Sequence, residues 1–398
     1  MNHIALINGR VVDGTGRPAM EPATVLVEGS VLAAVGPAPD IPLPKECKVI
    51  DVQGKTVLPT LMDGHMHVSG EPGRLDHMGH VRTNLQAVGK LQACLLWGTG
   101  TVAHAAGSVE NMILRDAIQS GQIHGCSDLL VGAVVTATCG HVRGRSADGP
   151  WEIRKALREM IAAGADHIKT CASGGFQWEH EKLTHEDYTL EELRVLVGQA
   201  HSRDKRVHVH AHAQPGLGNA IEAGCDVILH GALIDEPALE GIAAKDLWYM
   251  PTLHITSERA RAGGNWPAHM TERMKAAHPI HCAGVAKAHE MGIKIVTGTD
   301  GGPGSIMNEL RLLVDCGLSP MEALVAATRS TADVLGVLDK TGTLEVGKGA
   351  DLFVVNGDPA QNIAILSSKD SISLVMKRGI IQMAGDFDPN KADSGTDS

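Results

Sequence analysis

The chain has 398 residues, of which 43% are hydrophobic and 20% are charged, as in an ordinary soluble globular protein. Its net charge of −11, without any Lys/Arg-rich run, excludes nucleic acid and anionic membranes as expected partners. The eight cysteines include no CxxC pair, the N-terminus lacks a secretory signal, and no apolar run reaches the ~18 residues of a membrane span, so we expect a cytoplasmic protein.

Residues 1–58 consist of short β-like runs, each followed by a turn sequence. The turn sequences are Asn8-Gly9, Glu28-Gly29 and Gln53-Gly54. Asn-Gly and Glu-Gly between β-branched runs signal hairpins. Runs of the same kind return near the other end of the chain, at 351–355, 373–376 and 380–383. The two ends therefore predict one small β-sandwich built from residues 1–58 and 341–385, and the polar residues 386–398 are predicted to form a disordered tail.

Residues 59–340 change to short apolar strands that alternate with helical patterns, which is typical of βα units on a parallel sheet. Eight strands are predicted, near 57–65, 99–104, 129–137, 166–171, 206–212, 226–230, 247–253 and 293–299. Helices are predicted between them, for instance at 151–163, 190–203 and 321–335. This count indicates an α/β fold, a (β/α)8 TIM barrel. A doubly wound open sheet is the alternative, but no G-x-G-x-x-G sequence opens a helix here.

Histidines, a lysine and an aspartate stand where five of the eight predicted strands end. Active-site residues of such barrels gather at this C-terminal face. They are His65 and His67 on the first strand, Lys169 on the fourth, His208, His210 and His212 on the fifth, His230 on the sixth, and Asp300 on the eighth. Alternation along a strand turns both side chains of an HxH pair to one side. Packing alone gives no reason for this arrangement, which points to a metal site.

Several longer motifs carry a family resemblance that covers nearly the whole chain. They are "VLPTLMDGHMH", "HIKTCASGG", "HVHAHA" with "AIEAGCDVILHG", "WYMPTLHI", "GTD" and "GTLEVGKGADLFVVNGDP". With these motifs the sequence resembles the amidohydrolase superfamily. Within this superfamily, the sequence is most similar to the imidazolonepropionase-like metallo-carboxypeptidases, a subgroup with prolidase-like and ochratoxinase-like members.

The resemblance implies a binuclear centre that holds two divalent ions, with zinc expected. His65, His67 and Asp300 would bind one ion, and His210 and His230 the other. An ammonium group has donors only and cannot bind a metal, so Lys169 would bridge the ions as an N6-carboxylated lysine, a carbamate. Neutral imidazoles and carboxylates suit such ions. A hydroxide shared by the metals would attack an amide carbonyl, with Asp300 as the general base and acid.

Two other classes of protein compete with an amide hydrolase. Deaminases of this superfamily typically use one metal and a glutamate shortly after the strand-5 histidine, whereas here no acid follows His210 before Glu222. A non-catalytic structural relative would have lost ligands, and this chain retains all six. The expected reaction is hydrolysis of a dipeptide or an N-acyl amino acid, and a cyclic amide or lactam is the alternative substrate.

The substrate is expected to be a small molecule with a carboxylate. The sequence "TATCGHVRGRS" after the third strand brings His141, Arg143 and Arg145 to the rim, where an arginine can pair with a carboxylate. His212 either contacts the substrate or makes a structural hydrogen bond, and Trp178 either stacks on a substrate ring or packs in its loop. We also expect a homo-oligomer.

Overall fold

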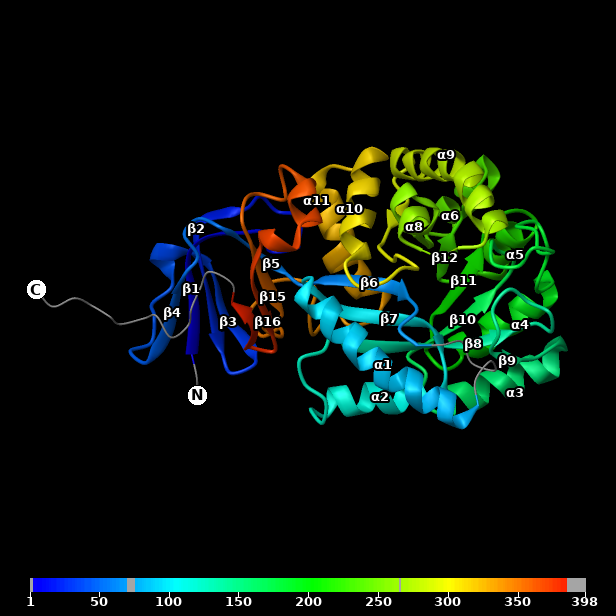
Figure 1. The fold of residues 1–398 in the computed structure, drawn as a ribbon, viewed down its shortest axis with the longest axis horizontal. Coiled ribbons are helices and arrows are strands. Elements are labelled where there is room, and N and C mark those ends of the chain that lie inside the picture. The colour runs from blue at the N-terminus through cyan, green and yellow to red at the C-terminus, as the bar shows by residue number, and fades with distance from the viewer. Residues whose placement is uncertain (1–2, 70–75, 265, 385–398) are drawn as a thin grey trace, which may run out of the picture.

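The computed structural model describes residues 3–69, 76–264 and 266–384. It confirms the predicted fold class, because an α/β barrel is joined to a β-sandwich formed by both ends of the chain (Figure 1). The predicted tail, 386–398, lies outside the described residues. No helix in the described ranges is long and apolar enough to cross a membrane.

The β-sandwich consists of eight strands in one folded sheet, seen on the left of Figure 1. Its strands are β1 (His3–Val11), β2 (Met20–Glu28), β3 (Val31–Pro37), β4 (Cys47–Asp51), β5 (Thr56–Pro59), β15 (Leu352–Val355), β16 (Ile372–Lys377) and β17 (Ile380–Ala384). Their order is β17-β16-β15-β5-β1-β2-β3, and β4 also pairs with β1. Strand β15 thus lies between β5 and β16, so neither end of the chain forms this sheet alone. A core of buried aliphatic side chains, among them Leu6, Val25 and Val354, fills the fold of the sheet.

The hairpin predicted at Asn8-Gly9 is wrong. Strand β1 runs straight through these residues, and its pairing with β2 shifts register between Leu6 and Gly9. Asn8 takes a positive φ of 56°, so the pair forms an irregularity within a strand. The turn at Glu28-Gly29 does join the antiparallel strands β2 and β3. An Asn-Gly pair supplies the backbone freedom of a turn, but neighbouring strands decided whether the chain reverses there.

The barrel strands run parallel in the order β14-β13-β12-β11-β10-β8-β7-β6. They are β6 (Leu61–Met66), β7 (Thr99–Gly107), β8 (Asp128–Thr136), β10 (His167–Cys171), β11 (Val207–Ala211), β12 (Val227–His230), β13 (Trp248–Met250) and β14 (Lys294–Ile295). A two-residue strand, β9 (Arg145–Ser146), pairs with β8. Strands such as β10 are buried on both faces, as expected where helices cover a parallel sheet.

Helices follow the strands around the barrel (Figure 1). They are α1 (His77–Leu96), α2 (Val109–Gln119), α3 (Gly149–Ala162), α4 (Leu190–His201), α5 (Gly216–Ala223), α6 (Glu236–Ala244), α7 (Leu253–Thr256), α8 (Glu258–Gly263), α9 (Ala268–Glu290), α10 (Ser305–Asp315), α11 (Pro320–Val325) and α12 (Thr331–Val334). Short 3-10 turns are η1 (Ala38–Asp40), η3 (Ile363–Ser367) and η4 (Lys369–Ser371), and a π-helical turn, η2 (Ala326–Ser330), joins α11 to α12.

The first predicted strand, 57–65, corresponds to two strands that belong to different sheets, and the second of them closes the barrel. Strand β5 belongs to the sandwich, whereas β6 opens the barrel. Gly64 N donates to Thr297 O at 2.9 Å, which joins β6 to the segment after β14. A Cβ on Gly64 would lie 2.8 Å from Thr297 O, so this close approach requires glycine. The closure brings the end of the first strand beside the end of the eighth.

A buried ion-pair cluster joins the sandwich to the barrel. Lys377 Nζ on β16 lies 2.8 Å from the Asp351 carboxylate and 2.7 Å from that of Asp128 on β8. Arg378 extends the cluster with an ion pair to Asp128 at 2.6 Å. Although burial opposes it, Lys377 lowers the pKa of Asp351. The cluster fixes the position of the sandwich against the N-terminal end of β8.

Candidate metal centre

Asp300 lies beside both histidines of the first barrel strand. Its backbone N–H donates to His65 O at 2.7 Å, and Oδ1 lies 3.6 Å from His65 Nε2 and 3.1 Å from His67 Nε2. Asp300 adopts a positive φ of 52°, a conformation that costs energy in a residue other than glycine. The backbone hydrogen bonds of the barrel closure hold Asp300 in this conformation, which turns its carboxylate toward the histidines.

His230, the last residue of β12, is held in a similar way. Its φ is +71°, and its carbonyl lies 2.9 Å from Tyr249 Oη and 2.8 Å from His281 Nε2. Its ring Nδ1 lies 2.6 Å from Thr252 Oγ1, which donates its single hydrogen to Pro251 O. The hydroxyl must therefore accept from His230 Nδ1–H, which leaves the lone pair of Nε2 available to a metal.

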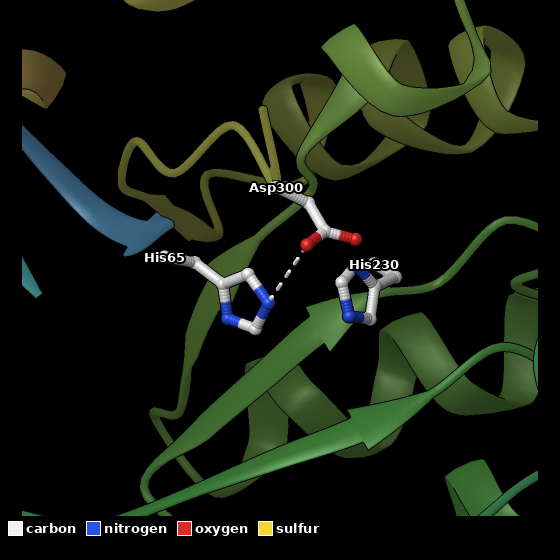
Figure 2. A group of neighbouring side chains, drawn as sticks. All are labelled: His65, His230 and Asp300. Carbon is white, nitrogen blue, oxygen red and sulfur yellow. Dashed lines mark ion pairs between the residues drawn. The ribbon is translucent and has the colours of Figure 1, made fainter. Parts of the chain in front are cut away.

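His65, His230 and Asp300 form a group that could hold a metal ion. One donor atom from each lies within 4.8 Å of the other two, and Figure 2 shows the three side chains converging from β6, β12 and the loop after β14. This group combines residues from both of the ligand sets expected from the family resemblance. His67 adjoins the group through Asp300, and His210 through a ring contact with His230 at 4.6 Å between centroids.

His141, His210 and His212 extend this group through ring contacts, which are stacked between His141 and His210 and between His212 and His230, and edge-to-face between His210 and His212. His210 lies 4.2 Å from His141 and 4.5 Å from His212, and His212 lies 5.0 Å from His230. Ala232 N donates to His212 Nδ1 at 3.4 Å, which leaves the ring proton on Nε2. The His208 ring packs against the ring of His167, with centroids 4.1 Å apart.

Burial keeps the imidazoles of His65, His210 and His230 neutral. It is the largest cause that lowers the pKa of His65, His210 and His230 well below the ordinary value, and the neighbouring charge of Lys169 lowers them further. A neutral imidazole has a lone pair to donate, so this environment favours the metal-binding form.

Lys169 lies among these histidines on β10 and is only 2% exposed. Within the described residues its ammonium makes no hydrogen bond or ion pair. A buried charge without a partner is costly, and proteins usually pair or neutralise it. The buried amine of Lys169 therefore lies beside the candidate ligands without a counter-charge among the described residues.

Two buried carboxyl groups hold the backbone around the centre, and neither was predicted as a site residue from the sequence. Asp63 accepts from His65 N at 3.2 Å and from Thr299 Oγ1 at 2.6 Å, and burial raises its pKa to about 7. Glu309 on α10 accepts from Leu253 N at 2.9 Å and His254 N at 2.7 Å, and burial raises its pKa to about 8. Asp63 stands inside the motif "MDGHMH", which was the available signal.

The centre opens into a cavity of about 820 Å³. His67, His141, His210, His212, His230 and Asp300 line one side of it. His254 also lines the cavity, and its Nδ1 lies 3.1 Å from Asn308 Nδ2. The motif "WYMPTLHI" contains His254, but its position at the site came only from the structure.

The predicted substrate residues occupy different positions around this cavity. His141 lines it, and its Nδ1 lies 2.8 Å from Glu181 Oε1, while its ring packs so closely on Gly175 that a Cβ there would clash. Trp178 also lines the cavity. Arg143 is exposed and lies over the Trp178 ring, 5.8 Å from its centroid, and it is not among the described lining residues.

Arg145 pairs with Glu159 on α3, with Nε 3.0 Å from Oε2. It too is absent from the described lining of the cavity. The structure therefore brings His141, His212 and Trp178 to the cavity, with Arg143 reaching it only through Trp178.

The barrel and its histidine–carboxylate rim define a hydrolase of the amidohydrolase class, and the chain belongs to the amidohydrolase family, whose model matches residues 56–381. It is 27% identical to an ochratoxinase of Aspergillus niger over 93% of this chain and 85% of that protein. It is 25% identical to an imidazolonepropionase of Rhizobium rhizogenes over 88% and 90% of the two chains. A Xaa-Pro dipeptidase crystal structure superposes with a TM-score of 0.85 at 26% identity, over 96% of this chain and 99% of that one.

Proposed function

We propose that this protein is a binuclear metal-dependent amidohydrolase that cleaves the C–N bond of a dipeptide or an N-acyl amino acid. The observation that carries the proposal is the convergence of His65, His230 and Asp300 beside a buried lysine that has no partner among the described residues. The similarity of this chain to a structure named a Xaa-Pro dipeptidase supports a dipeptide substrate.

The donor set fits two divalent ions, with zinc as the expected metal. His65, His67 and Asp300 would hold one ion, and His210 and His230 the other. Lys169 would bridge them after its neutral amine attacks carbon dioxide and loses a proton, which gives a carbamate anion. The carbamate would replace the buried ammonium, so no unpaired cation would remain at this position. When bound, the metals supply Lewis acidity, which polarises the amide carbonyl and makes water acidic enough to react at neutral pH.

Asp300 is the proposed general base and acid. Its carboxylate is 23% exposed and lines the cavity, so a water molecule and the amide nitrogen can both reach it. It would accept a proton from the attacking water at a carboxylate oxygen and return one to the leaving amine. Water and the amide are thereby converted to a carboxylic acid and an amine.

The cavity histidines and Trp178 would orient the substrate. His212 presents Nε2–H after its Nδ1 accepts from Ala232, so it can donate to a substrate oxygen. His141 is fixed by Glu181, and Arg143 holds the Trp178 ring from outside. We propose that the substrate carries a carboxylate. A homo-oligomeric state and a cytoplasmic location remain predictions from the sequence.

The test is a substrate screen with zinc-loaded protein. Dipeptides and N-acyl amino acids should yield an acid and an amine, whereas their cyclic analogues should react far more slowly. Turnover confined to cyclic amides would replace this proposal with a lactam hydrolase, and release of ammonia from a nitrogen heterocycle would replace it with a deaminase.

A further inference from the structure

The charged residues that line the cavity are few. Among its described lining residues, Asp300 is the one carboxylate, and Arg259 is the one arginine or lysine. A cavity that must hold a substrate carboxylate needs a cationic group or another strong donor inside it. Arg259 is therefore the first residue to consider for that contact, although no sequence motif predicted a role for it.

Arg259 lies at the cavity and has no partner among the described residues. It is the second residue of α8, its side chain is exposed, and it forms no hydrogen bond or ion pair with the described residues. Its charge acts on His254, which faces the same cavity: after burial, Arg259 is the next cause that lowers the pKa of His254, to about 4. Arg259 and His254 therefore belong to the lining of the same cavity.

The other arginines near the cavity are already engaged by the protein. Arg273 donates to the carbonyl oxygens of Trp178 at 2.8 Å and Glu179 at 2.6 Å. Arg145 pairs with Glu159, and Arg143 lies over Trp178. Arg261, two residues after Arg259, bonds to Thr256 O. Arg259 is the exception, and its five N–H donors are available for a planar carboxylate.

One wall of the cavity is apolar and rigidly held. Phe176, Ile255, Met270 and Met274 form one buried cluster, and all four line the cavity. The bonds from Arg273 fasten the loop after β10 to α9, so this wall is formed before a ligand binds. Such a surface gains about 25 cal/mol for each Å² of apolar ligand area that it buries.

We propose that Arg259 binds the substrate carboxylate and that the cavity takes amino acids acylated with a large aromatic or aliphatic group. This acyl group packs on the wall formed by Phe176, Ile255, Met270 and Met274. The proposal rests on the proposed function only for the bond that is cleaved. Carboxylate binding can be measured without catalysis, so the two can fail separately.

The experiment measures binding of an inert probe to the zinc-loaded full chain. The probe is N-(2-naphthylsulfonyl)-L-phenylalanine, whose sulfonamide is not an amide substrate, and its C-terminal carboxamide is the matched neutral ligand. Titration calorimetry gives Kd for the wild type, Arg259→Ala, Arg259→Lys and Arg143→Ala. Arg154→Ala, on the outer surface of α3, controls for loss of a remote positive charge.

Arg259→Ala should weaken the acid by about 10- to 100-fold and the carboxamide by less than about threefold, because only the acid loses a charge-assisted bond. Arg259→Lys should recover part of the loss. Equal weakening of acid and carboxamide, or a selective loss in Arg143→Ala instead, would overturn the role of Arg259.

A probe with a methylsulfonyl group tests the apolar wall. It should bind at least about tenfold more weakly than the naphthyl probe, since it leaves the wall in water. Equal affinities would overturn that part of the proposal. Selective binding without any amide hydrolysis would retain the carboxylate site and reject the proposed reaction.

Discussion

Thr252 Oγ1 lies 2.6 Å from His230 Nδ1 and donates its own hydrogen to Pro251 O. This pair of bonds fixes both the orientation of the His230 ring and the position of its proton. Because Nδ1 must be the protonated nitrogen, Nε2 carries the lone pair that faces Asp300 and His65. Thr252, which would not itself bind a metal, therefore decides which ring nitrogen of His230 has a free lone pair.

Thr252→Val should weaken metal binding by about 10- to 100-fold, because the isosteric side chain cannot accept from His230 Nδ1–H. Competition with a fluorescent zinc chelator measures the change. Thr252→Ser retains the hydroxyl and serves as the control. Identical affinities for the valine variant and the wild type would show that Thr252 does not set the ring.

Lys169→Ala should reduce the zinc content from nearly two equivalents per chain to one or fewer, because the bridging anion is gone. Elemental analysis of protein purified without chelator gives this number. In the wild type, 13C-labelled bicarbonate should produce a carbamate NMR signal that is absent from the variant. Two equivalents of zinc in Lys169→Ala would refute the carbamate bridge. About one equivalent in the wild type would favour a mononuclear centre and the deaminase alternative.

Asp300→Asn should lower kcat by about 100- to 10,000-fold, since the amide retains the shape of the carboxylate but cannot accept a proton from water. Zinc content is measured on the same sample, so that loss of metal is distinguished from loss of the base. Near-normal turnover with full metal content would mean that another group transfers the proton.

Lys377→Met tests the buried ion-pair cluster between the two lobes. Removing the cation leaves Asp351, which is 4% exposed, without its charge partner and should cost about 3–5 kcal/mol at pH 7. Because the folded state lowers the pKa of Asp351, this carboxylate stabilises the wild type above its unfolded pKa of about 3.9. That stability is lost as pH falls through the folded pKa.

The difference between Lys377→Met and the wild type should therefore shrink as pH falls from 7 toward 4, because the unpaired carboxyl of the variant becomes protonated. Urea unfolding at both pH values measures the two free energies, and Lys369→Met, an exposed lysine, is the control. A loss of stability that does not change with pH would show that Asp351 is not the group left unpaired.

Much of the fold was predictable because its signals are local. Strand and helix periodicity identified the barrel, and turn-broken β-runs at both ends identified the sandwich. The predicted first strand nevertheless spans β5 and β6, which belong to different sheets, and Asn8-Gly9 lies inside β1. Pairing with neighbouring strands decides both outcomes, and those strands lie outside the short sequence window from which each prediction was made.

The sequence by itself determined which side chains are the candidate ligands, because alternation on a strand and the common C-terminal rim of a barrel follow from residue type and spacing. Only the tertiary structure decided that Asp300 lies 3.6 Å from His65, far away in the sequence, since this contact depends on barrel closure at Gly64 and Thr297. It also decided that Arg259 lines the cavity while Arg143 does not. Whether an arginine side chain reaches the cavity depends on how its segment packs against distant elements, and no local pattern records that packing.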